Sequence, residues 1–285
     1  MGLPRSDEAG TRLVSRSVRA SVPSLRAALG AMPAPRIFWA APDEATVVAG
    51  GTAATVTADG SDRFAAVHEG IDRVLRSGDV HAGTEAACPR LFGGFAFHDE
   101  GTEDATWAGF PGAQFVLPRV QVTDTDRGTW LTVNAVGPDA TAEAVEDRLD
   151  AERGRFETLD DPAPTPAPEI VSRTRTTPRE SWRRSVEAAV SRIHAGDLRK
   201  VVLAQALAVT LDHPLSVPDV LARLGETYPD CYRFLVEPAT VGSDRPAFFG
   251  ATPERLVTRH GRTVTTDALA GTTGRGDTPA EDDWL

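Results

Sequence analysis

The feature that most limits how this chain can fold is a run of alternating prolines near its middle. From Pro162 to Pro168 every second residue is proline, directly after the acidic pair Asp160-Asp161. Proline lacks a backbone N–H and has a fixed φ, so this segment can form neither a helix nor a central strand. The sequence therefore predicts an amino-terminal region at residues 1–160, a surface connector at 161–168 and a second region at 169–285.

The amino-terminal region is predicted to contain more strands than helices. Its β-branched and aromatic runs are separated by Gly, Pro and Asp turns, and they follow one another without a regular alternation with helices. This order favours an α+β class with largely antiparallel sheets and packed helices over a doubly wound parallel sheet. The predicted strands are 36–40, 46–57, 90–98, 114–123 and 129–135, and the predicted helices are 63–77 and 140–158.

The second region is predicted to begin with a helix that has recognisable ends. Thr177 is expected to be the N-cap, Pro178 the first helical residue and Glu180 the partner that closes a capping box. The helix should end at Gly196, a good residue just beyond a helix carboxyl end. The elements expected after it are a strand at 200–210, a helix at 217–227 and strands at 232–236, 247–250, 254–258 and 263–266.

Charge and composition exclude several classes of partner. The chain has 41 acidic and 30 basic residues, for a net charge of −11, and its pI is near 5.0. This balance argues against nucleic acid or an anionic membrane as the main partner, and no window approaches the roughly 18 apolar residues of a membrane span. Two cysteines are too few for a disulfide framework, and the scattered histidines lack metal-ligand spacing. We therefore expect a cytoplasmic protein.

A single lysine is the most informative residue in this composition. Of the 30 basic residues, 29 are arginine and only Lys200 is lysine. Lys200 opens the apolar run 200–210, which is predicted to be a strand buried on both faces. Burial disfavours the charged form of a lysine, and a lysine, unlike an arginine, can then accept a proton near neutral pH. Lys200 is therefore a candidate general base.

Two later segments could supply further groups for chemistry. Glu254 follows an aromatic strand and a Thr-Pro turn, which can present a carboxylate towards a cavity. The segment 267–276 is rich in glycine and includes Arg275, so its free amides could hold a carboxylate or a phosphate. It is not a nucleotide-binding loop of the Walker type, because no Gly-Lys-Ser/Thr ends it.

Taken together, these segments resemble the chorismate-utilising enzymes, which include the anthranilate synthase component I-like proteins, and specifically the isochorismate synthases. Their order and separations match that family, well from about residue 90 onward and weakly before it. The segments that carry the resemblance are Ile193–Ala204, Phe249–Leu256, Ala268–Thr272 with Arg275-Gly276, and, upstream, Leu91–Phe97 with Trp107, Phe110 and Val116–Pro118.

The resemblance implies a reaction and a role for each site residue. Lys200 would be the general base that takes a proton from the water attacking C2 of chorismate, and Glu254 the general acid that protonates the hydroxyl leaving C4. Ala270, Gly271 and Thr272 would line the substrate site. Mg²⁺ would bind the carboxylate of the substrate. The product would be isochorismate, for menaquinone or siderophore biosynthesis.

The same positions discriminate among the members of the family. Anthranilate synthases have glutamine where this chain has Lys200, and aminodeoxychorismate synthases have a nucleophilic lysine where it has Ala270, so both activities are disfavoured. Salicylate synthases share the lysine and the glutamate and remain the alternative. Gln205 in place of a usual arginine and Thr252 in place of a usual serine are minor departures.

A larger departure lies at the carboxyl end. Members of the family continue through a helix with a Glu-His pair that supplies a magnesium ligand and then a His-Pro-Thr-Pro segment, whereas the last residue here is Leu285. We therefore expect the magnesium ligands beyond residue 285, with no metal ligand within this chain, and a catalytic domain that is incomplete at its carboxyl end. A non-catalytic fragment, or a split subunit that needs a complementary carboxyl-terminal chain, is the second hypothesis.

Overall fold

The chain forms two compact units. The computed structural model describes residues 12–99, 105–239, 246–268, 274 and 276–278. The large unit comprises Met1–Pro162 and Leu221–Leu285, and the small unit comprises Ala163–Val220. The large unit thus includes part of the region that the sequence assigned to a second domain, because a strand near residue 235 pairs with one near residue 38. The boundaries at 1–160, 161–168 and 169–285 stay a prediction.

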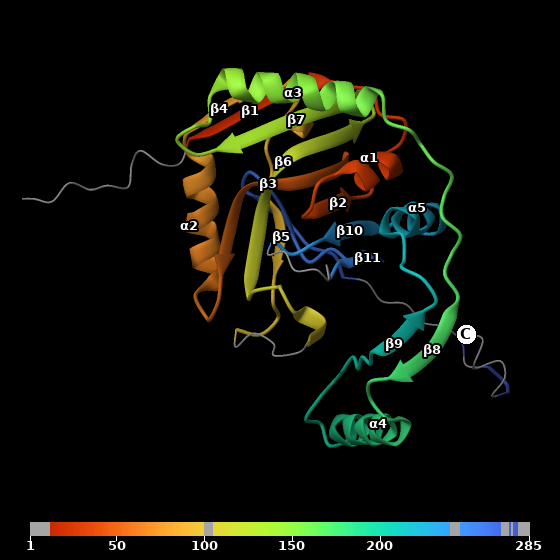
Figure 1. Ribbon diagram of the computed structural model, residues 1–285. Helices are drawn as coiled ribbons and strands as arrows, with labels where there is room; N and C mark the ends of the chain where they lie inside the picture. The colour runs from red at the N-terminus through yellow and green to blue at the C-terminus, as the bar shows by residue number, and fades with distance from the viewer. Residues whose placement is uncertain (1–11, 100–104, 240–245, 269–273, 275, 279–285) are drawn as a thin grey trace, which may run out of the picture. The chain divides into compact units, whose positions relative to one another are not determined.

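A nine-stranded sheet forms the centre of the large unit (Figure 1). Its strand order is β11-β10-β2-β3-β6-β7-β1-β4, and β5 pairs with β6 beside this path. Every described pair in it is antiparallel except β1 with β4. The strands are β1 (Leu13–Arg19), β2 (Arg36–Ala40), β3 (Thr46–Ala58), β4 (Gly78–His81), β5 (Phe92–Phe95), β6 (Ala113–Thr125), β7 (Gly128–Val136), β10 (Tyr232–Val236) and β11 (Phe248–Thr252).

Helices cover the sheet and bury its apolar residues. In Figure 1, α3 crosses β1 and β7 and contacts both strands. α2 lies beside β3 and contacts it. Leu131 and Phe156 are fully buried, which makes this the hydrophobic core of the protein. The α+β class with largely antiparallel strands is thereby confirmed. The helices of the large unit are α1 (Leu25–Ala31), α2 (Arg63–Leu75) and α3 (Ala142–Glu157), with short 3-10 helices η1 (Glu85–Ala87) and η2 (Ala105–Trp107). A further helix, α5 (Val217–Thr227), begins in the small unit and ends in the large one.

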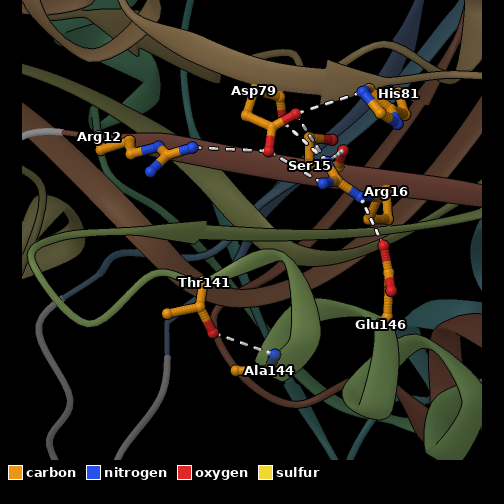
Figure 2. A network of polar contacts seen from close by, with 8 residues as sticks. All are labelled: Arg12, Ser15, Arg16, Asp79, His81, Thr141, Ala144 and Glu146. Atoms are coloured by element: carbon orange, nitrogen blue, oxygen red, sulfur yellow. Dashed lines mark hydrogen bonds and ion pairs between the residues drawn. The ribbon is translucent and has the colours of Figure 1, made fainter.

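A buried arginine ties the edge strand β4 to the rest of the large unit (Figure 2). Arg16 of β1 donates two hydrogen bonds to the carboxylate of Asp79 in β4, at 2.9 and 3.2 Å, and one to Glu146 of α3 at 3.1 Å. The bond from Arg16 lowers the pKa of Asp79 below its usual value. Arg12 and His81 approach the same carboxylate at 3.7 and 3.3 Å. The network fixes β4 and α3 against β1.

The small unit has almost no interior. It contains β8 (Ile170–Arg175), α4 (Arg179–His194) and β9 (Leu207–Leu211), and the two strands form an isolated antiparallel pair. Its residues are exposed or half-buried, with Asp219, at its end, as the exception. Even the predicted apolar face of α4 is open to solvent within the described residues, since Val186 and Val190 are 37% and 44% exposed. This unit does not bury the apolar surface that its sequence provides.

Two predictions for the small unit need correction. Residues 200–206 form no strand, and β9 is exposed rather than buried on both faces. The reason is that β8 is short and its ladder ends at Thr176, whose N–H bonds to the carbonyl of Ala206, so the residues before Ala206 have no strand to pair with. The capping box is also wrong. Pro178 is the N-cap, and Glu180 pairs with Arg183 at 2.6 Å instead.

Elsewhere the predicted elements agree with the structure or shift by a few residues. β2, β10 and α5 have the predicted bounds, and Gly196 follows α4 with a φ of 84°, as expected of a residue that ends a helix. The predicted strand at 254–258 is wrong, because β12 (Thr258–His260) begins only at its last residue and pairs with β13 (Thr263–Thr265). No helix within the described residues is long and apolar enough to cross a membrane.

Candidate active site

Lys200, the predicted base, lies in the small unit shortly after α4. It is exposed and belongs to no helix or strand. Its apolar neighbour Val202 is 80% exposed. The predicted burial of this lysine is therefore wrong for the small unit as described, and burial within this unit does not make Lys200 a base.

Glu254, the predicted acid, lies in the large unit at the end of the β10–β11 hairpin. Thr252 is the last residue of β11 and pairs with Tyr232 of β10. Pro253 cannot continue the ladder because it has no N–H. The N–H of Glu254 instead donates to the hydroxyl of Thr252 at 3.2 Å, which turns the chain and leaves the carboxylate exposed. We call Thr252–Glu254 the Thr-Pro-Glu corner.

The hairpin beneath this corner is held by aromatic contacts. The ring of Phe248 lies 5.0 Å from that of Phe234 and 5.1 Å from that of Trp107, and Trp107 also packs on Phe110. Such tilted and edge-on ring pairs stabilise by about 0.5–1.5 kcal/mol each beyond their buried area. Trp107 thus supports the strand that leads to Glu254.

Two side chains connect the Thr-Pro-Glu corner to the segment after β13. Nη2 of Arg255 donates to Oδ1 of Asp267 at 2.8 Å, and Oγ1 of Thr266 donates to the carbonyl of Leu256 at 2.8 Å. The Asp267 carboxylate, with a smaller contribution from Tyr232, raises the pKa of Arg255 above its usual value against the effect of burial. The structure therefore brings together two of the segments that resemble the family, Phe249–Leu256 and the residues leading into Ala268–Thr272.

The predicted substrate-binding residues Ala270, Gly271 and Thr272 lie outside the described residues. Lys200 belongs to the small unit and Glu254 to the large unit. All five site assignments therefore stay predictions.

A buried ion pair that sequence reasoning missed holds β10 in the sheet. Glu237, 3% exposed, receives two hydrogen bonds from the Arg36 guanidinium at 2.7 and 2.9 Å and one from the Arg36 backbone N–H at 2.7 Å. Gln114 of β6 bonds to Ala239 at 3.0 Å just beyond. The sequence offers one signal for this pair, an acidic residue directly after an apolar strand. If such a residue is buried, its carboxylate needs a cationic partner. Its partner lies 201 residues earlier and cannot be found from a local pattern.

Two surface hollows occur in the large unit away from these residues. One, of about 600 Å³, includes Arg90 and Arg127 in its lining, and the other, of about 340 Å³, includes Arg119 and Arg148. Neither is lined by Glu254. These hollows therefore do not supply the candidate active site.

The described residues do not fit a magnesium site. Mg²⁺ requires several oxygen ligands in near-octahedral geometry, and among the described residues no group of three or more His, Cys, Asp or Glu side chains could hold a metal ion. The expectation of ligands beyond residue 285 stays a prediction.

Two curated relatives match most of this chain. A Bacillus subtilis protein named isochorismate synthase MenF is 32% identical over 257 residues, which cover 87% of this chain and 53% of the relative. A Pseudomonas aeruginosa protein named salicylate biosynthesis isochorismate synthase is 31% identical over 251 residues and is covered to 50%. The chain thus spans about half the length of these curated relatives.

Solved structures show the same fold. The menaquinone-specific isochorismate synthase MenF from Escherichia coli matches with a TM-score of 0.67 at 20% identity, covering 98% of this chain and 60% of that one. Anthranilate synthase component I from Streptococcus pneumoniae matches with a TM-score of 0.56 at 16% identity, covering 80% and 54%. The model of the family of chorismate binding enzymes matches residues 8–285. The chain therefore belongs to the chorismate-binding enzyme family.

Proposed function

We propose that this chain is the amino-terminal part of an isochorismate synthase, which converts chorismate to isochorismate for menaquinone or siderophore biosynthesis. The observation that carries the proposal is the similarity to the Bacillus subtilis isochorismate synthase over 87% of the chain. The single lysine and the Thr-Pro-Glu corner add to it, because the resemblance to the family implies a base at the one and an acid at the other.

The proposed chemistry assigns one proton transfer to each unit. Nζ of Lys200, in its neutral form, takes a proton from a water molecule as the oxygen of that water bonds to C2 of chorismate. The ring double bonds shift, the C4–O bond breaks, and Glu254 gives its proton to the departing hydroxyl, which leaves as water. One water is consumed and one is released, so the reaction is an isomerisation.

The exposure of Lys200 sets a condition on this mechanism. A lysine acts as a base near neutral pH only where its surroundings destabilise the ammonium form. We therefore propose that a carboxyl-terminal segment, in the same or a separate chain, covers Lys200 and the apolar residues around it. This agrees with the fraction of its relatives that the chain spans, 53% of the Bacillus subtilis protein. For the same reason we propose that the 285 residues alone neither turn over chorismate nor bind magnesium tightly.

Two alternatives remain. A salicylate synthase would carry the reaction further, eliminating pyruvate from isochorismate, and it would use the same Lys200 and Glu254. The second alternative is a chain without catalytic activity of its own. The open surface around Lys200 favours the second if no complementary segment is expressed with the chain. A cytoplasmic location is proposed in either case, in agreement with the two free cysteines Cys88 and Cys231.

One experiment separates these functions. The purified chain is incubated with chorismate and Mg²⁺, alone and together with the corresponding carboxyl-terminal segment of the Bacillus subtilis relative, and isochorismate, salicylate and pyruvate are followed by chromatography. Isochorismate formed only with the added segment supports the proposal. Salicylate with equal pyruvate indicates the first alternative, and no product under either condition contradicts catalytic activity. Calorimetric titration of the chain alone with Mg²⁺ should give millimolar or weaker binding.

A further inference from the structure

The Arg255–Asp267 ion pair has no role in the proton transfers described above, although it adjoins Glu254. Arg255 follows the proposed acid directly in the chain, and its partner Asp267 lies 12 residues away, beyond the β12–β13 ribbon. The bond from Thr266 to Leu256 closes the same loop 10 residues apart. Two side-chain contacts thus clamp the backbone immediately after the Thr-Pro-Glu corner.

The position of Glu254 depends on few other described contacts. Its side chain is exposed, and its backbone N–H has one weak partner, the Thr252 hydroxyl at 3.2 Å. Arg255, by contrast, is 26% exposed in its side chain, and its Nε is buried without a hydrogen-bond partner among the described residues. A guanidinium partly removed from water at this point requires the carboxylate of Asp267, so the pair restricts where the backbone at residue 255 can lie.

We propose that Arg255 is a positioning residue for Glu254, which acts through its ion pair with Asp267. The inference rests on the proposed function. The pair holds the corner against the segment that follows β13, and the carboxylic acid of Glu254 is thereby kept in one place relative to the bound substrate. Proton transfer requires heavy-atom distances of about 2.6–3.2 Å, and a displacement of about 1 Å can cost about 100-fold in rate.

Steady-state kinetics test the catalytic part of the proposal in the reconstituted enzyme, which is the chain combined with the carboxyl-terminal segment of the Bacillus subtilis relative. The variants are Arg255→Gln, Asp267→Asn and the double variant, with Arg255→Lys as the conservative replacement and Arg262→Gln, an exposed arginine of the β12–β13 turn, as the matched control. Each single variant should lower kcat about 10- to 100-fold, with KM changing less than about 3-fold. The double variant should lose no more than either single one, Arg255→Lys should recover part of the loss, and Arg262→Gln should behave as wild type.

Hydrogen exchange tests the structural part without any need for activity. In the full 285-residue chain, Arg255→Gln and Asp267→Asn should increase amide exchange of residues 254–257 and 266–268, whereas exchange in β6 and β7 should not change. Unchanged exchange in both variants would overturn the clamp. An unchanged kcat in an active enzyme would overturn the positioning role. A rise in KM as large as the fall in kcat would overturn it as well. A wild-type enzyme without activity would reject the proposed function and with it the catalytic role, and exchange would still decide whether the pair holds the corner.

Discussion

The two compact units differ most in what lies inside them. The large unit buries the side chains of a nine-stranded sheet under helices, and residues such as Leu131 and Phe156 are fully enclosed. The small unit is also rich in valine, leucine and isoleucine but leaves these residues exposed or half-buried. Burial of apolar surface stabilises by about 25 cal/mol per Å², so the large unit can be stable by itself whereas the small unit depends on what covers it. The proposed acid lies in the first and the proposed base in the second.

The largest expected effect concerns the base in the small unit. Lys200→Arg should lower isochorismate formation in the reconstituted enzyme by at least about 1,000-fold, because arginine keeps the charge but cannot accept a proton near neutral pH. Arg199→Lys is the matched control, and the double exchange Arg199→Lys with Lys200→Arg should not restore the rate. Circular dichroism should show no change in fold. Substantial activity in Lys200→Arg would remove the base assignment.

The acid in the large unit should give a smaller loss. Glu254→Gln keeps the size and the hydrogen bonding of the side chain but removes the transferable proton, so kcat should fall about 100-fold or more with little change in KM. The comparison of interest is with Lys200→Arg, since both variants should reduce kcat rather than weaken binding. An unchanged kcat would show that the corner carries some other function.

Stability measurements should separate the two units directly. Leu131→Ala removes a fully buried side chain of the large unit and should lower the free energy of unfolding by about 2–5 kcal/mol in urea titrations. Val186→Ala on α4, 37% exposed, should change it by less than about 0.5 kcal/mol. Equal decreases in the free energy of unfolding for Leu131→Ala and Val186→Ala would show that α4 is packed against another surface in solution. Adding the complementary segment should make Val186→Ala more costly.

The smallest expected effect is a pH dependence in the large unit. Arg16 lowers the pKa of Asp79 in the folded chain below its value of 3.8 in an unfolded one. The pair therefore stabilises the fold fully above that unfolded value, and the contribution is lost as pH falls through the folded pKa. Asp79→Asn should flatten the decline of stability below about pH 4, whereas Asp150→Asn on the exposed side of α3 should not. Thermal unfolding at pH 3–6 provides the measurement.

The fold was predictable from the sequence where one local pattern was sufficient. β2 and β10 have the predicted bounds because a short β-branched or aromatic run between turn residues is a local signal. The run after Lys200 was apolar in the same way, yet residues 200–206 form no strand, because a strand also needs a partner and the pattern does not say which segment provides one. β1 was not predicted, since its polar Ser15 and Arg16 are buried only through contacts with distant strands and with α3.

The sequence proposes residues for the candidate site but not their arrangement. The single lysine and the resemblance to the family select Lys200 and Glu254, and both roles stay predictions. Arg255, in contrast, is one of 29 arginines, and nothing local distinguishes it. Its importance arises from Asp267, 12 residues later, and from a buried Nε that only the folded chain reveals.

The pairing of β2 with β10 also has a consequence for synthesis on the ribosome. The Arg36–Glu237 pair joins residues 201 positions apart, and at about 5–20 residues per second β10 emerges about 10–40 s after β2. During that interval the outer edge of β2 has no neighbour, and unpaired strand edges are sites of aggregation. The nascent chain is thus most vulnerable while the small unit is being translated, and chaperone dependence should end once β10 has left the exit tunnel.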